Sequence, residues 1–285
     1  MLFRKKSRIS SSKVTEIRRK KFLTRILLVV LILLILFVAS IFVSKISSIN
    51  IVNIVVKNEG SVVTEKEILG VANNNIVGKY LSLYPKTNIF IYGKEKIKTN
   101  IYEKFKRIKN VDIERIGFNG INITIKERSP AGLWCGKKIN TEEQCYFLDE
   151  DGFIYTEAPT FSGSVFFRNY GNITGKEQIG SNFLNSEKFK GISFFVKSIK
   201  DANVNPISFF ANDSGDYEIY LGDNSKNYNF YDGKIIFNSD DNLGEIFNNL
   251  MTILNERTLV KGLSDNVQLD YIDLRFGKKV FYRLK

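Results

Sequence analysis

The sequence predicts an α+β protein with an N-terminal transmembrane helix, a small mixed unit, and a larger, mostly antiparallel β domain with two flanking helices. Three patterns indicate this fold class. A long uncharged apolar run lies near the N-terminus, short β-branched segments alternate apolar and polar residues, and other segments repeat apolar residues every three or four positions. The composition, 44% hydrophobic and 25% charged, is typical of folded globular material.

The apolar run extends from Ile26 to Val43 and contains Ser40 as its only polar residue. At about 1.5 Å per residue its length comes to roughly 28 Å, close to the thickness of the hydrocarbon core of a bilayer. We therefore expect a transmembrane helix over residues 26–45. A cleaved signal peptide is the alternative, but the run is longer than a signal core and no A-x-A site follows it.

The net charge of +12 is concentrated before this run. Residues 1–25 hold ten of the 42 Lys and Arg residues and one of the 30 acidic residues, so 32 basic and 29 acidic residues remain for the rest of the chain. A nearly neutral body argues against nucleic-acid binding. The positive-inside rule predicts a basic cytoplasmic tail at 1–25 and places everything after Lys45 on the other side. The tail is either a solvated topogenic segment or one that also touches anionic lipid.

A small β-α-α-β-β unit follows the span. Thr64 and Glu67 are spaced as a capping box, which predicts a helix start, and an Asn119-Gly120 pair is typical of a tight hairpin turn. We expect two helices on one side of a three-stranded sheet within residues 46–128. The expected elements are a strand at 49–57, helices starting at Thr64 and at Lys94, and strands at 111–116 and 121–127.

Pro130 marks the start of a second domain, at 129–285, because proline lacks the donor that a central strand needs. Two helical stripes are clear, one from Ser186 to Ile199 and one over Asp240–Glu256. The expected strands lie at 133–135, 145–148, 153–156, 206–210, 217–221, 228–231, 234–237, 267–276 and 280–284.

Cys135 and Cys145 are the only cysteines, so each is the other's only intramolecular partner. They flank a nine-residue segment between two expected strands. Outside the cytoplasm a disulfide between them would staple a hairpin and contribute roughly 2–3 kcal/mol. Two free thiols are the alternative.

The sequence contains few candidate catalytic residues. The chain has no histidine, which excludes Ser-His and Cys-His pairs and the commonest zinc sites, and it has no glycine-rich nucleotide loop. Two converging acids could still cleave a glycan, but no pair stands out. We therefore predict no catalytic, cofactor-binding or metal-binding residues, no small-molecule substrate and no enzymatic activity.

The terminal hairpin is the best candidate for a functional site. Along the strand from Val267, Ile272, Leu274 and Phe276 are expected on one face and Tyr271, Asp273 and Arg275 on the other. We expect the last strand, 280–284, to be an uncovered edge, which can accept a strand from another protein. The alternative is that Lys278, Lys279 and Arg283 only blunt this edge against aggregation.

Several of these pieces resemble the bacterial cell-division family FtsQ/DivIB. They include Asn88-Ile89-Phe90, ITIKER at 123–128 followed by Pro130 and Trp134, Phe147-Leu148-Asp149 with Asp151-Gly152, and LDYIDLRF at 269–276. The resemblance covers most of the chain and implies a POTRA domain at 46–128 and a partner-binding β domain. The cysteine pair departs from the family pattern and puts the local conformation around Trp134 in doubt.

By resemblance, the function would be that of a single-pass plasma-membrane scaffold of the divisome at the septum. It would bind small coiled-coil partners of the FtsB and FtsL type and influence the septal peptidoglycan synthase complex. The partner-binding residues implied by motif position are Tyr271, Asp273, Arg275, Phe276, Val280, Phe281, Tyr282 and Leu284. The alternatives are a membrane-anchored cell-wall enzyme and a POTRA-bearing secretion or assembly factor.

Overall fold

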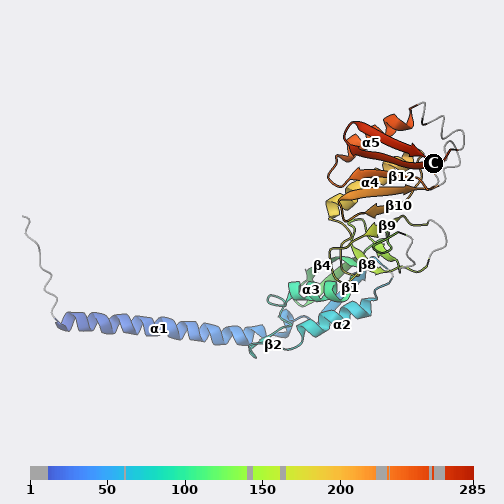
Figure 1. Ribbon diagram of the computed structural model, residues 1–285. Helices are drawn as coiled ribbons and strands as arrows, with labels where there is room; N and C mark the ends of the chain where they lie inside the picture. Colours follow the sequence, from blue (N-terminus) through green and yellow to red (C-terminus); the bar gives the residue numbers. More distant parts are fainter. Residues whose placement is uncertain are drawn as a thin grey trace, which may run out of the picture. The chain divides into compact units, whose positions relative to one another are not determined.

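The computed structural model describes residues 12–60, 62–139, 144–160, 165–222, 230, 232–256, 259 and 267–285 (Figure 1). It confirms the predicted α+β fold class, with an N-terminal apolar helix, a small mixed region and a C-terminal β-rich region. The chain forms two compact units. Unit 1 comprises residues up to Lys104 together with Asn110–Lys126, and unit 2 comprises Phe105–Lys109 and Glu127–Lys285. The predicted domain boundary at 128/129 is close to this division but stays a prediction.

Helix α1 (Ser12–Ser44) contains the apolar run. Its segment Glu16–Ser44 reaches a mean hydropathy of 3.6 over 18 residues, none of them buried, so by length and composition it can cross a membrane. Helix α1 starts before the predicted span at 26–45. The preceding segment is rich in Lys and Arg, which are good helix formers although they do not enter lipid. Residues 1–11 of the predicted cytoplasmic tail lie outside the described part of the chain.

Unit 1 is built on a three-stranded sheet in the order β1-β5-β4. Strand β1 (Asn53–Asn58) runs parallel to β5 (Gly120–Glu127), and β4 (Ile108–Ile116) lies on the other side of β5. Helices α2 (Glu65–Ile76) and α3 (Lys94–Lys104) follow β1, separated by a small hairpin of β2 (Lys79–Tyr80) and β3 (Tyr84–Pro85). The core is largely isoleucine, with full burial at Ile68, Ile97, Ile101, Ile121, Ile123 and Ile125.

The capping box that starts α2 is present. The Thr64 hydroxyl accepts a hydrogen bond from the Glu67 amide at 3.3 Å, and the Glu67 carboxylate accepts one from the Thr64 amide at 2.9 Å. These bonds, with Thr64 as the main cause, lower the pKa of Glu67. Two free N–H groups of the first turn are thereby satisfied, which fixes where the helix begins.

Two local details of unit 1 differ from the sequence prediction. The first strand starts at Asn53 and not at Ile49, because Ser47–Ile49 forms a 3₁₀ turn. In the β4–β5 connection the positive φ angle, +63°, belongs to Gly117 and not to the Asn119-Gly120 pair. Glycine adopts this conformation at no steric cost, so the turn is placed one residue after β4.

Unit 2 is a single nine-stranded sheet in the order β14-β13-β12-β11-β10-β9-β6-β7-β8. Most neighbours are antiparallel, but β12–β13, β9–β10 and β6–β9 are parallel pairs. The strands are β6 (Gly132–Trp134), β7 (Tyr146–Leu148), β8 (Ile154–Glu157), β9 (Arg168–Gly171), β10 (Pro206–Ala211), β11 (Asp216–Leu221), β12 (Lys234–Asn238), β13 (Leu269–Phe276) and β14 (Lys279–Leu284).

Helices α4 (Ser186–Asp201) and α5 (Leu243–Leu254) contribute to the main core of this unit. Buried aromatic rings from α4 and the sheet meet edge to face, for example Phe195 against Phe237 with ring centroids 5.3 Å apart. The N-caps are Asn185 and Asn242, each accepting from first-turn amides, so α4 begins at Ser186 as expected and α5 begins at Leu243, later than the expected start at Asp240.

Two further sequence predictions need comment. Strand β9 was not predicted, because only four residues, RNYG, form it and they show no alternation. The predicted strand at 228–231 falls mostly on residues outside the described ranges. Beside β6 and β7 the structure joins Cys135 and Cys145 in a disulfide, with Cα atoms 4.1 Å apart.

The capping box gives a direct test of local stability in unit 1. Replacing Thr64→Ala removes the side-chain acceptor and is expected to destabilise α2 by about 1 kcal/mol. In the full chain in detergent, hydrogen exchange of the α2 amides should then be about fivefold faster than in the wild type. Thr64→Ser keeps the hydroxyl and should exchange at the wild-type rate. Unchanged exchange in Thr64→Ala would show that the box does not stabilise this helix.

Candidate functional site at the C-terminal sheet edge

Strands β13 and β14 form the terminal hairpin of unit 2 and the edge of its sheet (red in Figure 1). Their antiparallel register places Tyr271 opposite Arg283, Ile272 opposite Tyr282 and Asp273 opposite Phe281. Among the strands that the structure describes, β14 pairs with β13 on one side and with none on the other. The outer side of β14 therefore presents backbone groups without a ladder partner from these strands.

The side chains of this edge divide between the two faces of the sheet. On the face covered by the helices, Val280, Tyr282 and Leu284 are partly buried and pack against the main core. On the opposite face, Phe281 is 50% exposed and its ring meets that of Phe276 at a centroid distance of 5.2 Å. A strand added beside β14 would thus meet a partly buried apolar surface on one face and two exposed aromatic rings on the other.

Strict alternation predicted that Phe276 shares a face with Ile272 and Leu274. The structure shows that it does not. The register shifts between Asp273 and Phe276, which adds a residue on β13 relative to β14. Such a bulge interrupts the alternation of side chains, and Phe276 is 55% exposed while Ile272 and Leu274 are fully buried.

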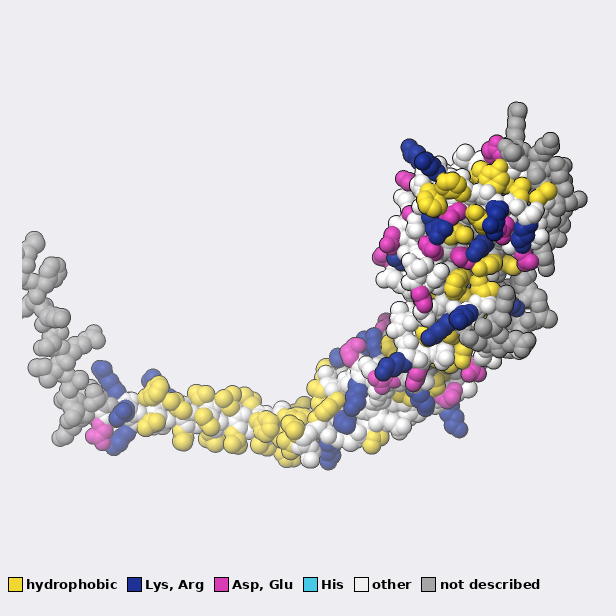
Figure 2. Space-filling model, viewed as in Figure 1, with side chains coloured by type: hydrophobic (Ala, Val, Ile, Leu, Met, Phe, Trp, Pro, Cys, Tyr) yellow, Lys and Arg dark blue, Asp and Glu magenta, His cyan; other side chains and the backbone are white. Residues whose placement is uncertain are grey.

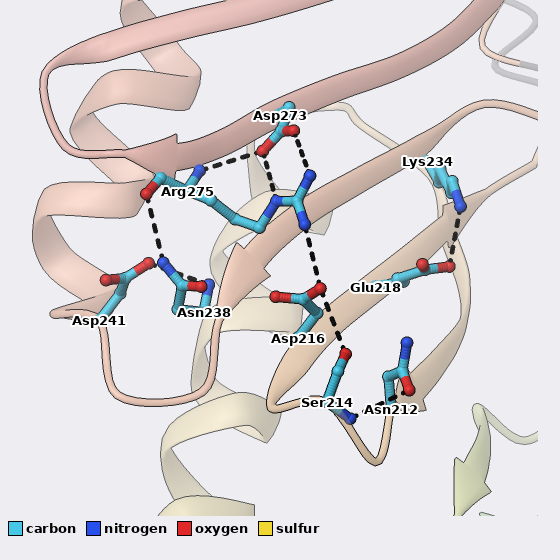
Figure 3. Close-up of polar contacts among 9 residues, drawn as sticks. All are labelled: Asn212, Ser214, Asp216, Glu218, Lys234, Asn238, Asp241, Asp273 and Arg275. Atoms are coloured by element: carbon cyan, nitrogen blue, oxygen red, sulfur yellow. Dashed lines mark hydrogen bonds and ion pairs between the residues drawn. The ribbon is translucent and has the colours of Figure 1, made fainter.

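Asp273 and Arg275 are bound to each other inside the sheet (Figure 3). Arg275 donates from Nε to Asp273 Oδ1 at 2.9 Å and from Nη2 to Oδ2 at 2.6 Å. The remaining Nη1 donates to Asp216 Oδ2 on β11 at 3.0 Å. Burial acts to raise the pKa of Asp273, but the hydrogen bonds and charge of Arg275 outweigh it and hold this pKa below its ordinary value. Arg275 thus connects Asp273 on β13 to Asp216 on β11, and neither Asp273 nor Arg275 is left without a partner.

The turn between the two strands is also fixed by distant residues. Asn238 donates to the carbonyl of Arg275 at 3.3 Å, and Asn249 on α5 donates to the carbonyl of Gly277 at 2.9 Å. Gly277 has a φ angle of +64°, which suits glycine at a tight turn. The sequence pattern contained no signal for Asp216, Asn238 or Asn249, because each lies far from the hairpin along the chain.

A mixed basic and aromatic row crosses the exposed face of the sheet behind this edge. Lys234 lies over the Tyr220 ring at 5.8 Å, and Arg283 lies over the Tyr271 ring at 5.1 Å. Glu218 accepts from Tyr220 at 2.6 Å and from Lys234 at 3.1 Å, and burial followed by this hydrogen bond raises the pKa of Tyr220. In register order the row is Arg283, Tyr271, Lys234 and Tyr220.

The structure offers little that could hold a cofactor or a metal. Within the described residues, no group of three or more Cys, Asp and Glu side chains comes close enough to ligate an ion. A hollow of about 240 Å³ lies beside α4, and none of its lining residues is a carboxylate. It therefore lacks the acid pair that glycan cleavage needs. The lining comprises Ala131, Phe167, Asn169, Phe189, Ile192, Ser193, Val196, Lys197, Lys200 and Pro206.

Comparison with known proteins identifies the small mixed region. Residues 49–128 match the family model described as POTRA domain, FtsQ-type. This match covers the three-stranded sheet and helices α2 and α3 of unit 1, and it supports a division-associated role and interaction with other division proteins. The apolar helix in front of it supports membrane anchoring. No curated protein matches the chain.

The Asp273–Arg275 pair predicts a pH-dependent contribution to stability. Because the pKa of Asp273 is lowered on folding, its contribution is present above about pH 4 and is lost as the pH falls further toward the folded-state value. Asp273→Asn should lower the free energy of unfolding at pH 7 by about 1–3 kcal/mol. The difference from wild type should shrink below about pH 4, as followed by Trp134 fluorescence in urea.

Asp270→Asn is the matched control for this experiment. It removes the partner of Arg283, whose side chain is largely exposed, and such surface pairs contribute only about 0–1 kcal/mol. A difference between Asp273→Asn and wild type that stays constant from pH 7 to pH 3 would rule out the assigned ionic contribution.

Proposed function

Since an FtsQ-type POTRA domain behind an N-terminal apolar helix fits a protein of the FtsQ/DivIB family, we propose that this chain is a membrane-anchored scaffold of the bacterial division machinery. It binds small bitopic coiled-coil proteins of the FtsB and FtsL type at the septum. Through them it regulates the septal peptidoglycan synthase complex. The chain itself catalyses no reaction, in keeping with a family of non-catalytic scaffolds.

The observation that carries this proposal is the one-sided pairing of β14. A partner strand laid along it would complete the ladder at a spacing of about 4.8 Å and bind mainly through backbone hydrogen bonds. Specificity would come from the side chains on either face, namely the apolar surface of Val280, Tyr282 and Leu284 and the exposed rings of Phe276 and Phe281.

The charge around the edge favours an acidic partner segment. Lys278, Lys279 and Lys285 are exposed at the two ends of β14. Arg283 already pairs with Asp270, so its charge is partly compensated within the hairpin. Lysines at an edge also discourage self-association, so partner binding and protection against aggregation require separate tests.

The proposed topology follows from the sequence of the anchor. The basic tail before the span stays in the cytoplasm and both units lie on the opposite side of the plasma membrane. A single-pass topology puts the β14 edge in the compartment where the ectodomains of bitopic division proteins would be found. It also provides an oxidising setting for the Cys135–Cys145 disulfide.

Photo-crosslinking from positions 280–284 in living cells tests the proposed edge. We expect capture of small bitopic division proteins. Phe281→Asp should weaken partner binding by about 30-fold, because it removes a central aromatic contact, and Val280→Asp or Tyr282→Lys should act in the same direction. Phe194→Asp changes another exposed phenylalanine, on α4, and should leave binding unchanged.

Near-UV circular dichroism must show that the edge variants keep the wild-type fold. Equal affinity of Phe281→Asp and Phe194→Asp, with both folded, would place the partner site elsewhere. If the edge serves only against aggregation, the variants should change self-association and leave partner capture intact.

Depletion of the protein tests the division role independently of the site. A scaffold of the septum predicts filamentous or unseparated cells, visible by microscopy. An assembly factor for outer-membrane or secreted proteins predicts normal septa with loss of envelope proteins. Normal division after complete depletion would remove the proposed role.

A further inference from the structure

Exposed apolar side chains gather at the end of unit 1 that adjoins α1. Leu81 is 89% exposed, Phe118 is 69% exposed and Phe90 is 56% exposed, and Val52, Val77 and Ile116 are also exposed. Figure 2 shows hydrophobic side chains continuing from α1 onto this end of the unit. Single exposed apolar residues need no explanation, but a group of large ones at one end indicates an interaction surface.

Backbone hydrogen bonds place these side chains beside the linker that joins α1 to β1. The Ile51 amide donates to Thr87 at 2.8 Å, and the Val52 amide donates to Asn119 at 2.9 Å. The segment before Phe90 and the turn that carries Phe118 therefore both lie against the residues that follow the helix. Asn88 strengthens this arrangement, since its side-chain amide donates to the carbonyl of Ser44 at 3.2 Å.

The β2–β3 hairpin lies directly against the last turns of α1. The hydroxyl groups of Tyr84 and Ser40 are 2.7 Å apart, and Ser40 lies inside the apolar run. Four helical residues rise about 6 Å, so Ser40 is only one turn from the end of the helix at Ser44. In a bilayer spanned by the apolar run, the hairpin consequently lies at the depth of the lipid interface.

The tip of this hairpin has an unusual conformation for its sequence. Leu81 and Ser82 have φ angles of +47° and +61°, a region that glycine and asparagine occupy readily and that is unfavourable for a leucine. Leucine is therefore not the residue that the turn requires. An exposed leucine in a strained position indicates a use outside the fold of the unit.

Aromatic rings and lysines surround the same end. Lys86 lies over the ring of Tyr80, and Lys45 lies over the ring of Phe42, each at 5.8 Å from the ring centroid. Tyrosine is enriched where membranes meet water, and lysines there extend their amines toward the head groups. This combination of leucine, tyrosine and lysine matches the chemistry of a lipid interface.

We propose that this end of unit 1 docks onto the membrane leaflet at the carboxyl end of α1, with Leu81 inserted among the lipids. The surface is a second membrane contact, separate from the helix. It fixes the tilt of the POTRA domain relative to the bilayer. This inference rests on the membrane anchoring included in the proposed function, and it does not depend on the β14 edge.

Depth measurement on the full chain tests this contact. Leu81→Cys is labelled with an environment-sensitive fluorophore, while Cys135 and Cys145 stay protected in their disulfide. The protein is placed in nanodiscs of phosphatidylcholine and phosphatidylglycerol that contain a lipid with a nitroxide near the head group. We expect at least twofold quenching and a blue-shifted emission at position 81.

Two further labelled positions serve as controls. Leu31→Cys lies in the middle of the apolar run and should be quenched best by a deep nitroxide. Val62→Cys is an exposed apolar position beyond the opposite end of β1 and should not be quenched. Quenching at 31 with none at 81 would overturn the docked surface and leave the anchor intact. Absence of quenching at 31 would overturn the anchor, and the docked surface with it.

A second variant separates lipid contact from folding. Leu81→Asn removes the apolar tip but suits a positive φ angle, so the hairpin should fold at least as well. The fluorophore is then placed on the neighbouring position by Ser82→Cys. Quenching of this label should be much weaker with Leu81→Asn than in the chain that keeps Leu81. Partner capture at the β14 edge should be unchanged. Undiminished quenching would show that Leu81 does not mediate the contact.

Discussion

The outer side of β14, unpaired among the strands that the structure describes, is the constraint on which the proposed role of unit 2 depends. An open sheet has two edge strands, and within the described residues these are β14 and β8. The far edge, β8, is four residues long and already shares backbone hydrogen bonds with Gly180 and Ser181, whereas β14 has six residues with apolar side chains on both faces. The longer edge is thus the one at which a partner strand gains the most hydrogen bonds and the most side-chain contact.

The interior of unit 2 keeps this edge in position. Arg275 bridges Asp273 and Asp216, Asn238 holds the backbone of β13, and Asn249 holds the turn from α5. Since β13 is the one neighbour of β14 among the described strands, these contacts to β11, β12 and α5 limit how far the terminal hairpin can bend. A rigid edge loses less conformational entropy when it accepts a strand, which favours binding.

The sequence predicted features that depend on neighbouring residues and missed those that depend on distant ones. The capping box at Thr64 and Glu67 and the apolar stripes of α4 and α5 repeat at fixed spacings, so they could be recognised. The strands that carry the candidate residues were predicted at 267–276 and 280–284, but the bulge that turns Phe276 outward was not predicted. The bridge from Arg275 to Asp216 spans 59 positions, and no local pattern encodes it.

The parallel pairing of β1 and β5 has a mechanical consequence. The amino end of β1 leads to the helix in the membrane, and the carboxyl end of β5 leads into unit 2. Tension between α1 and unit 2 would pull β1 and β5 in opposite directions along their axes. The force would then be shared by the six register pairs from Asn53–Gly120 to Asn58–Ile125. Sliding would require all of these bonds to break together, so the parallel pairing would resist opening under such tension.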